Sequence, residues 1–467
     1  MIIFPSKKVV VRFHLNKPIK INMKPQILRK TILAGLMSAP LFIFAESYVT
    51  ADNGDWDTLT TWTPNGTPGS ADEVTFRGGY TVDLNHSASV SKINYTNIAD
   101  ADINTFNITG IGTVFDVANT FQIWYNTRLN LNVLDGATAN LTEISWGSGG
   151  YSNITVRDAV LNTRFSQMKG SNVGDGSFLT ITNTTGKTSK FVNTAGTEFK
   201  IEPGTDYKMT VDVNGSGSIL DLNQQTLSLR AENGGAAKLI VRNGAKVINL
   251  GGFTLNNNMA NTSNQIIIYG QGSAISVRES GAVTLAIGVD AAAATDSTTN
   301  ITFGGKDEFG VFHAADASAL TNNWEVRVYS SGSVTFNLGD SNFSTSMTTT
   351  ASDAIFAGQF TKTFEGALNV DFANISLLTE GTYYVALISS AGESLLKGIS
   401  GDKTLADWEN ILNVTGESSN VKFEQILLGG TNDNILFAQI SVIPEPGTYA
   451  AIFGALALGL AAYRRRK

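Results

Sequence analysis

Few residues in this chain could carry out nucleophilic or acid–base chemistry. The histidines are His14, His86 and His313, and there is no cysteine. The lack of cysteine excludes disulfides, thiolate metal sites and cysteine nucleophiles. His86 and His313 have no partner at metal-ligand spacing, and no Gly-x-Ser-x-Gly motif marks a nucleophilic serine. We therefore predict no catalytic residue, no cofactor and no metal site.

Carboxylates offer the other route to an enzyme, because glycoside hydrolysis needs two acids at a defined separation and a calcium site needs several. The acids here are scattered beside turns, as at Asp52, Asp55 and Asp57. Adjacent acids such as Asp72 and Glu73 would point to opposite faces of a strand. We predict a protein that is not an enzyme. The alternative is a secreted polysaccharide-binding or polysaccharide-degrading protein.

The composition is that of a secreted β-rich protein. Charged residues make up only 16% of the 467 residues, whereas glycine is abundant at 46 and proline is scarce at 9. Residues 1–45 and the last 24 residues hold 12 of the 33 basic residues but only one of the 40 acidic ones. The body between them therefore has a net charge of −18. Such a charge argues against nucleic acid as a partner.

Two short motifs recur between about residues 93 and 301. The first is Gly-x-Gly followed by a short strand with alternating apolar residues, at 110–117, 174–181, 215–222 and 270–277. The second has a glycine followed by alanine, at 133–137, 241–245 and 277–282. Glycine at a corner supplies a positive φ, and we expect the alanine to point into a narrow bend. The motif spacing suggests coils of about 21 residues.

These strands and corners predict an all-β chain whose main fold is a right-handed parallel β-helix, a solenoid, over residues 46–302. A pair of β-sandwiches is the alternative. Longer strands follow, and residues 303–441 should form a smaller β-rich C-terminal module or a cap on the solenoid. We expect one helix there, over residues 405–412, with Thr404 as its N-cap and Asp407 in its first turn.

The N-terminal 45 residues read as an export signal. Met23 begins a typical signal peptide, with Lys24, Arg29 and Lys30 before an apolar run and Ala45 at the cleavage site. We expect translation to start at Met23, since a signal counted from Met1 would be too long.

The mature chain then opens with Trp56 and Trp62 among turn residues, which resembles the start of autotransporter-like β-helix proteins. The aromatic rings should close the end of the first coil. Stacking on a carbohydrate is the alternative role for these two tryptophans.

The C-terminal tail, residues 442–467, has three parts in a fixed order. Pro444, Glu445 and Pro446 break regular structure, and an uncharged apolar run of 15 residues follows at 449–463. As a helix this run would be about 23 Å long, short against a bilayer core of roughly 30 Å. Cations end the chain and should retain it on the cytoplasmic side. The membrane-facing residues are expected to be Tyr449, Phe453, Leu456, Leu458, Leu460 and Tyr463, and the retaining cations Arg464, Arg465, Arg466 and Lys467.

This order of parts resembles the PEP-CTERM sorting tail of Gram-negative bacteria. The resemblance implies a single C-terminal transmembrane helix as a temporary anchor, and cleavage near Pro444–Pro446 by an exosortase, a membrane protease. It also implies release to the cell surface or the extracellular matrix. The expected partners are the secretion translocon, the exosortase, the membrane before processing, and an extracellular polysaccharide. A buried core helix and an ordinary tail anchor are the alternatives for this segment. The chain should therefore be an exported structural or adhesive protein.

Overall fold

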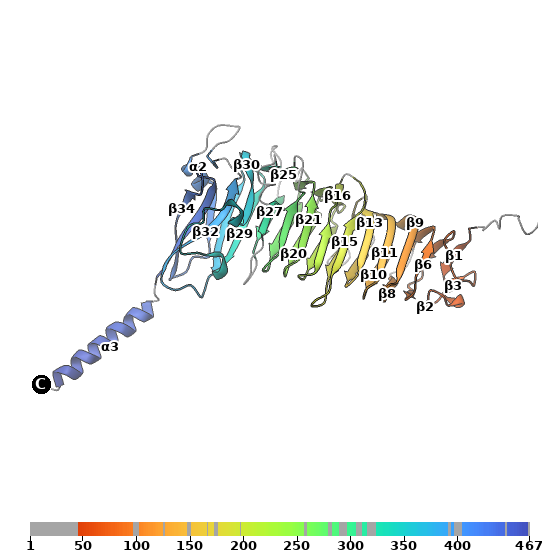
Figure 1. Ribbon diagram of the computed structural model, residues 1–467, viewed down its shortest axis with the longest axis horizontal. Coiled ribbons are helices and arrows are strands. Elements are labelled where there is room, and N and C mark those ends of the chain that lie inside the picture. The colour runs from red at the N-terminus through yellow and green to blue at the C-terminus, as the bar shows by residue number, and fades with distance from the viewer. Residues whose placement is uncertain are drawn as a thin grey trace, which may run out of the picture. The chain divides into compact units, whose positions relative to one another are not determined.

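The computed structural model describes residues 45–96, 102–124, 127–146, 151–165, 167–171, 176–196, 198–255, 259–278, 283–288, 297–304, 311–314, 324–390, 394–396, 404–443 and 446–465. Within these ranges the protein is all-β, with 35 strands in sheets of 13 and 22 strands. All but three of the strand pairings described are parallel, which excludes the sandwich alternative. The long parallel ladders are consistent with a β-solenoid, and Figure 1 shows strands of successive coils side by side in chain order.

Each coil contributes one strand to the 13-stranded sheet. Its members are β2 (Gly54–Asp55), β5 (Thr81–Leu84), β8 (Asn104–Thr109), β10 (Arg128–Leu134), β12 (Tyr151–Arg157), β14 (Ser177–Thr182), β17 (Lys208–Asn214), β20 (Ala236–Arg242), β23 (Ser263–Tyr269), β26 (Thr298–Phe303), β29 (Ser333–Gly339), β31 (Ala367–Asn374) and β33 (Leu412–Thr415).

The 22-stranded sheet contains two parallel ladders, which are joined by β30 (Phe356–Phe364), a strand that pairs with both of them. One ladder, with its flanking strands, comprises β1 (Ser47–Thr50), β3 (Trp62–Thr63), β4 (Glu73–Phe76), β6 (Ala88–Val90), β7 (Lys92–Tyr95), β9 (Val114–Ile123), β11 (Thr138–Trp146), β13 (Val160–Phe165), β15 (Ser189–Asn193), β18 (Ser218–Asp221), β21 (Lys246–Leu250), β24 (Ala274–Val277), β27 (Val311–Ala314), β30 (Phe356–Phe364), β32 (Gly381–Ser390), β34 (Val421–Gly429) and β35 (Ile435–Val442). The other comprises β16 (Glu198–Ile201), β19 (Thr226–Leu229), β22 (Gly252–Leu255), β25 (Val283–Ile287) and β28 (Trp324–Val328).

The core is built from rows of inward side chains, because alternate residues of a strand face the same side. One row follows the register of the 13-stranded sheet, and every member has no exposed surface. It consists of Val82, Phe106, Leu131, Ile154, Leu179, Val211, Leu239, Ile266, Ile301, Val334 and Leu368. An unbroken apolar row of this kind holds successive coils together without any disulfide.

The coil length differs from the expected 21 residues. Register partners lie 23 positions apart at Leu129 and Ser152, 27 apart at Ala236 and Ser263, and 35 apart at Ser263 and Thr298. In the middle of the chain a coil contains three strands, for example β17, β18 and β19. Three strands and three corners need more residues than the motif spacing suggested.

Most copies of the two sequence motifs mark the same corner, where the chain leaves the 13-stranded sheet. Gly215, with φ of 98°, lies between β17 and β18, and Gly244, with φ of 81°, lies between β20 and β21. Ala137 and Ala245, which follow the glycines of the second motif, are buried as expected. Gly176 lies at a different corner, before β14, so the four Gly-x-Gly motifs are not equivalent.

The parallel ladders continue past residue 303 through β29, β31 and β33. Only then does the pattern change, with β32, β35 and β34 pairing antiparallel. Helix α2 (Leu405–Asn410) forms where the sequence predicted it, and Thr404 donates to Asp407 Oδ2 through its backbone nitrogen (2.6 Å) and its hydroxyl (2.8 Å). Of the two forms predicted for residues 303–441, this pairing fits a cap that continues the sheets of the solenoid. The remaining helices described are η1 (Leu59–Thr61), η3 (Asp340–Asn342), η4 (Ala351–Asp353) and α3 (Pro446–Arg465).

Candidate functional site

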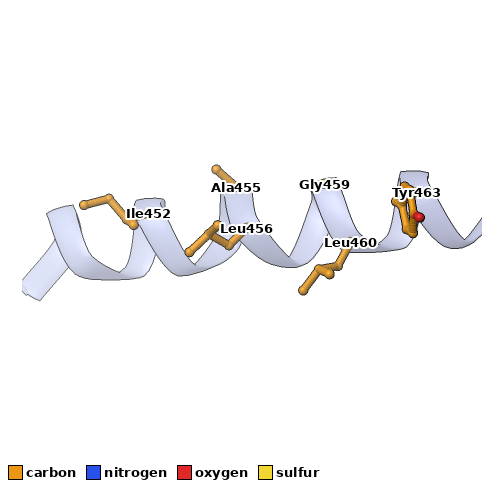
Figure 2. A pocket seen from close by; sticks show the side chains of 6 residues that line it. All are labelled: Ile452, Ala455, Leu456, Gly459, Leu460 and Tyr463. Atoms are coloured by element: carbon orange, nitrogen blue, oxygen red, sulfur yellow. The ribbon is translucent and has the colours of Figure 1, made fainter.

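The tail forms helix α3, and every side chain described in it, from residue 451 to 465, is exposed. The exposed fraction is 67% for Phe453, 73% for Leu458 and 60% for Tyr463. Figure 2 shows the side chains that line a surface hollow along this helix, which are Ile452, Ala455, Leu456, Gly459, Leu460 and Tyr463. A buried core helix is thereby excluded, because core helices turn their large apolar side chains away from water.

The sorting residues themselves are only partly described. Pro444 and Glu445 lie outside the described residues, and so do Arg466 and Lys467. Pro446 is the first residue of α3, a position that proline favours because the first helical N–H needs no partner within the helix. Arg464 and Arg465 lie in its last turn, where positive charge interacts favourably with the helix dipole.

We expected this tail to form a transmembrane helix. In the part of the chain that the structure describes, no helix combines the length and the apolar character needed to cross a membrane.

The two N-terminal tryptophans are core residues. Trp56 and Trp62 have no exposed surface and pack edge to face with ring centroids 5.0 Å apart. Trp56 also stacks on Phe106, and Trp62 packs against Phe76. The Trp62 indole donates to the backbone oxygen of Trp56 at 2.8 Å. The alternative of carbohydrate stacking by either tryptophan is therefore wrong, since stacking needs an exposed ring face. By contrast, the side chain of Trp124 is 50% exposed.

His86 has a partner that the sequence did not indicate. Its Nε2 lies 3.2 Å from Asp57 Oδ1, and the side chains are 38% and 60% exposed. The two residues meet because their loops flank neighbouring coils. The side chain of His313 lies outside the described residues. Among those described, no group of three or more His, Asp or Glu side chains is placed to hold a metal ion.

The outer surfaces of the 13-stranded sheet and of one strand ladder of the 22-stranded sheet each have a short side-chain ladder of asparagine and aspartate. Asn107 donates to Asp83 at 2.7 Å, and Asn132 donates to Asn107 at 2.8 Å. On the other sheet Asn140 donates to Asp116 and Asn162 donates to Asn140, each at 2.8 Å. A hollow of about 270 Å³ lies beside this second ladder, lined in part by Asp116 and Asn140. Parallel in-register pairing stacks these side chains, so each amide fulfils part of its neighbour's hydrogen bonding.

A second surface hollow, of about 240 Å³, lies at the corner between β16 and β17. Lys169, Gly204, Thr205, Tyr207 and Glu232 line it. The sequence analysis missed this site because Lys169 and Glu232 are 63 positions apart. The only local signal was the turn sequence from Pro203 to Tyr207. An ammonium, a carboxylate and an aromatic ring all line this hollow.

No family model matches this chain, and neither a curated protein nor a solved structure matches it. Function must therefore be argued from its own residues.

Proposed function

We propose that this chain is an exported, non-enzymatic protein of the cell surface or extracellular matrix. In this proposal a signal peptide starting at Met23 exports it, and a PEP-CTERM tail delivers it to an exosortase. The body is a right-handed parallel β-helix with a structural or adhesive role. The tail holds the chain at the membrane until it is cut near Pro444–Pro446.

The observation that carries the proposal is the exposure of the apolar residues of α3. Six large side chains there, from Ile452 to Tyr463, each have half or more of their surface exposed. Complete burial of a large apolar side chain contributes about 1.5–3 kcal/mol. Between 51% and 73% of each of these side chains is exposed, so transfer of all that exposed surface from water into a membrane interface would be favourable by roughly 6–11 kcal/mol in total. The following arginines suit an anionic lipid surface.

Removal of the tail would suit a protein that is released, because an apolar helix left exposed to water would promote aggregation. The Pro-Glu-Pro sequence, whose last residue Pro446 begins α3, is where the resemblance to the PEP-CTERM family puts the cut. Cutting there would leave a body that is negatively charged and lacks the apolar helix. Such a body suits a hydrated extracellular layer.

The test is fractionation of a bacterium that makes an exosortase and expresses the full-length chain. We expect the surface form to begin at Glu46 and to lack residues 449–467, as read by mass spectrometry of the terminal peptides. In the Glu445→Ala variant we expect uncut protein in the membrane fraction. Glu380→Ala, at an exposed site in the body, is the matched control and should be sorted normally.

Recovery of surface protein that retains Arg464 and Arg465 would contradict the proposal. So would normal processing after deletion of the exosortase gene. The polysaccharide-binding alternative is compatible with the same route of export, and the corner hollow favours it as an additional property.

A further inference from the structure

The corner hollow is built around one lysine held between two carboxylates. Lys169 Nζ lies 3.6 Å from Glu202 Oε2 and 3.3 Å from Glu232 Oε1. The side chain of Lys169 is only 16% exposed, whereas that of Glu232 is 44% exposed. The ammonium is therefore fixed in direction, while one carboxylate remains accessible from solvent.

Three consecutive coils form the walls, and backbone hydrogen bonds fix them to one another. Glu202 N donates to Met168 O at 2.9 Å, and Gly204 N donates to Lys169 O at 3.0 Å. Glu232 N donates to Pro203 O at 2.9 Å. The polar groups of the hollow thus stand on a rigid scaffold, which lowers the entropic cost of binding.

Gly204 keeps the hollow open. Its φ is outside the left-handed region, so the backbone conformation does not require glycine there. A Cβ at this position would lie 2.9 Å from Tyr207 Cδ2 and 3.8 Å from Glu232 Oε2. A side chain would therefore occupy the space between the tyrosine ring and the carboxylate.

We infer that this hollow binds one ring of a neutral sugar. The ammonium of Lys169 donates to a ring hydroxyl, and the carboxylate of Glu232 accepts from a neighbouring hydroxyl. The hydroxyl of Thr205 can do either, and the ring of Tyr207 offers an apolar face to the C–H groups. A volume of about 240 Å³ is below the roughly 300–1,000 Å³ of sites for drug-sized ligands, and suits a single ring.

Charge sets the specificity. Lys169 is outnumbered by Glu202 and Glu232, so the site has a net negative charge, as does the body around it. A sugar acid would be repelled and a neutral sugar would not. Because the hollow opens to solvent, the bound ring can belong to a free monosaccharide or to a long chain.

This inference depends on the proposed location outside the cell, where the sugar would be part of an extracellular polysaccharide. The test uses the purified full-length chain on an array of neutral and uronic-acid oligosaccharides. Calorimetric titration of the best binder, and of its monosaccharide, follows. We expect a neutral oligosaccharide to bind at least ten-fold more tightly than its uronic-acid counterpart. If the natural ligand is a polysaccharide, the oligosaccharide should also bind more tightly than the monosaccharide.

Two variants locate the site. Glu232→Gln removes the accepting charge with little change of shape, and Gly204→Ala fills the hollow; each should weaken binding at least ten-fold. Glu198→Gln breaks the similar exposed ion pair with Lys200, 2.8 Å apart, outside the hollow, and should bind normally. Circular dichroism of each variant checks that it is folded.

The inference is overturned if no neutral glycan binds, if uronic acids bind equally well, or if folded Glu232→Gln and Glu198→Gln bind alike. None of these results depends on cleavage of the tail. A failed titration therefore leaves the sorting proposal standing, and failed sorting leaves the titration interpretable.

Discussion

Asp158 lies at a corner of the solenoid and provides the sharpest test of how successive coils are held together. Its side chain is 1% exposed, and it accepts hydrogen bonds from Thr184 N at 2.7 Å and from Thr184 Oγ1 at 2.8 Å. Thr184 is one coil further along the chain. The perturbation is Asp158→Asn, which keeps the shape, and asparagine tolerates the φ of 53° found there.

The expected cost follows from these contacts. A hydrogen bond to a charged group contributes about 1.5–3 kcal/mol, and the asparagine oxygen can replace only one of the two acceptors. Lys187 Nζ lies 3.7 Å away but is 60% exposed, so its attraction adds little. We expect the Asp158→Asn variant to lose roughly 1.5–3 kcal/mol of stability at neutral pH.

The loss should depend on pH. Burial alone would raise the pKa of Asp158, but the hydrogen bonds from Thr184, with the charges of Lys187 and Arg157, outweigh it and lower the pKa below its usual value. A lowered pKa stabilises the folded state above the unfolded pKa of about 3.9, and this stabilisation is lost as the pH falls through the folded pKa. The difference between wild type and variant should therefore be constant above about pH 5 and shrink below about pH 4.

The assay is urea unfolding of the full-length chain, followed by circular dichroism, together with hydrogen exchange of the Thr184 amide. Exchange is needed because solenoids can open locally. Asp206→Asn is the matched control, since Asp206 has a φ of 60° and is exposed. Equal effects of the two substitutions would refute the reasoning. A difference that persists undiminished well below the folded pKa would refute it as well.

Two further predictions concern the first coil and a glycine corner. Trp62→Phe should destabilise the protein by about 1–3 kcal/mol more than Trp56→Phe. The first substitution removes the hydrogen bond of the Trp62 indole, whereas the buried indole nitrogen of Trp56 has no partner among the described residues. Thermal unfolding compares the two variants, and equal losses would contradict the prediction. Gly244→Ala should cost about 1–2 kcal/mol, since φ is 81° and the new Cβ would lie 3.1 Å from Ser216 Cβ. The midpoints of urea unfolding measure this loss of stability. Gly339→Ala is the unstrained control, because a Cβ added there meets nothing within 4 Å. Equal shifts of the midpoint in the Gly244→Ala and Gly339→Ala variants would contradict this prediction.

Much of the fold was predictable because it depends on local features. Alternation of apolar residues identified β29 and β32, and Thr404 with Asp407 identified the start of α2. The glycine-rich loop at 429–434 is typical of a hairpin and joins β34 to β35. The coil length was wrong because the spacing of glycine motifs does not reveal how many strands a coil contains.

The candidate sites also divide into those made of contiguous residues and those made of residues from separate coils. The prediction of a sorting tail rests on the order of its parts, which is a property of contiguous residues, and it stays a prediction. The corner hollow and the pair of His86 with Asp57 could not be recognised, because their members come from separate coils. Carbohydrate stacking, the alternative role for Trp56 and Trp62, was excluded only by the structure, since burial depends on what packs over a ring.

The sequence by itself determined the all-β character, the positions of most strands and corners, and the chemistry of the C-terminal tail. These features arise from φ preferences and from side-chain alternation within a few residues. Only the tertiary structure decided which strands pair, because parallel register partners lie between 19 positions apart, at Glu73 and Lys92, and 44 apart, at Leu368 and Leu412. Loop insertions change that distance from coil to coil. It also decided that Lys169 meets Glu232, since parallel stacking brings corners of successive coils together regardless of their separation in the chain.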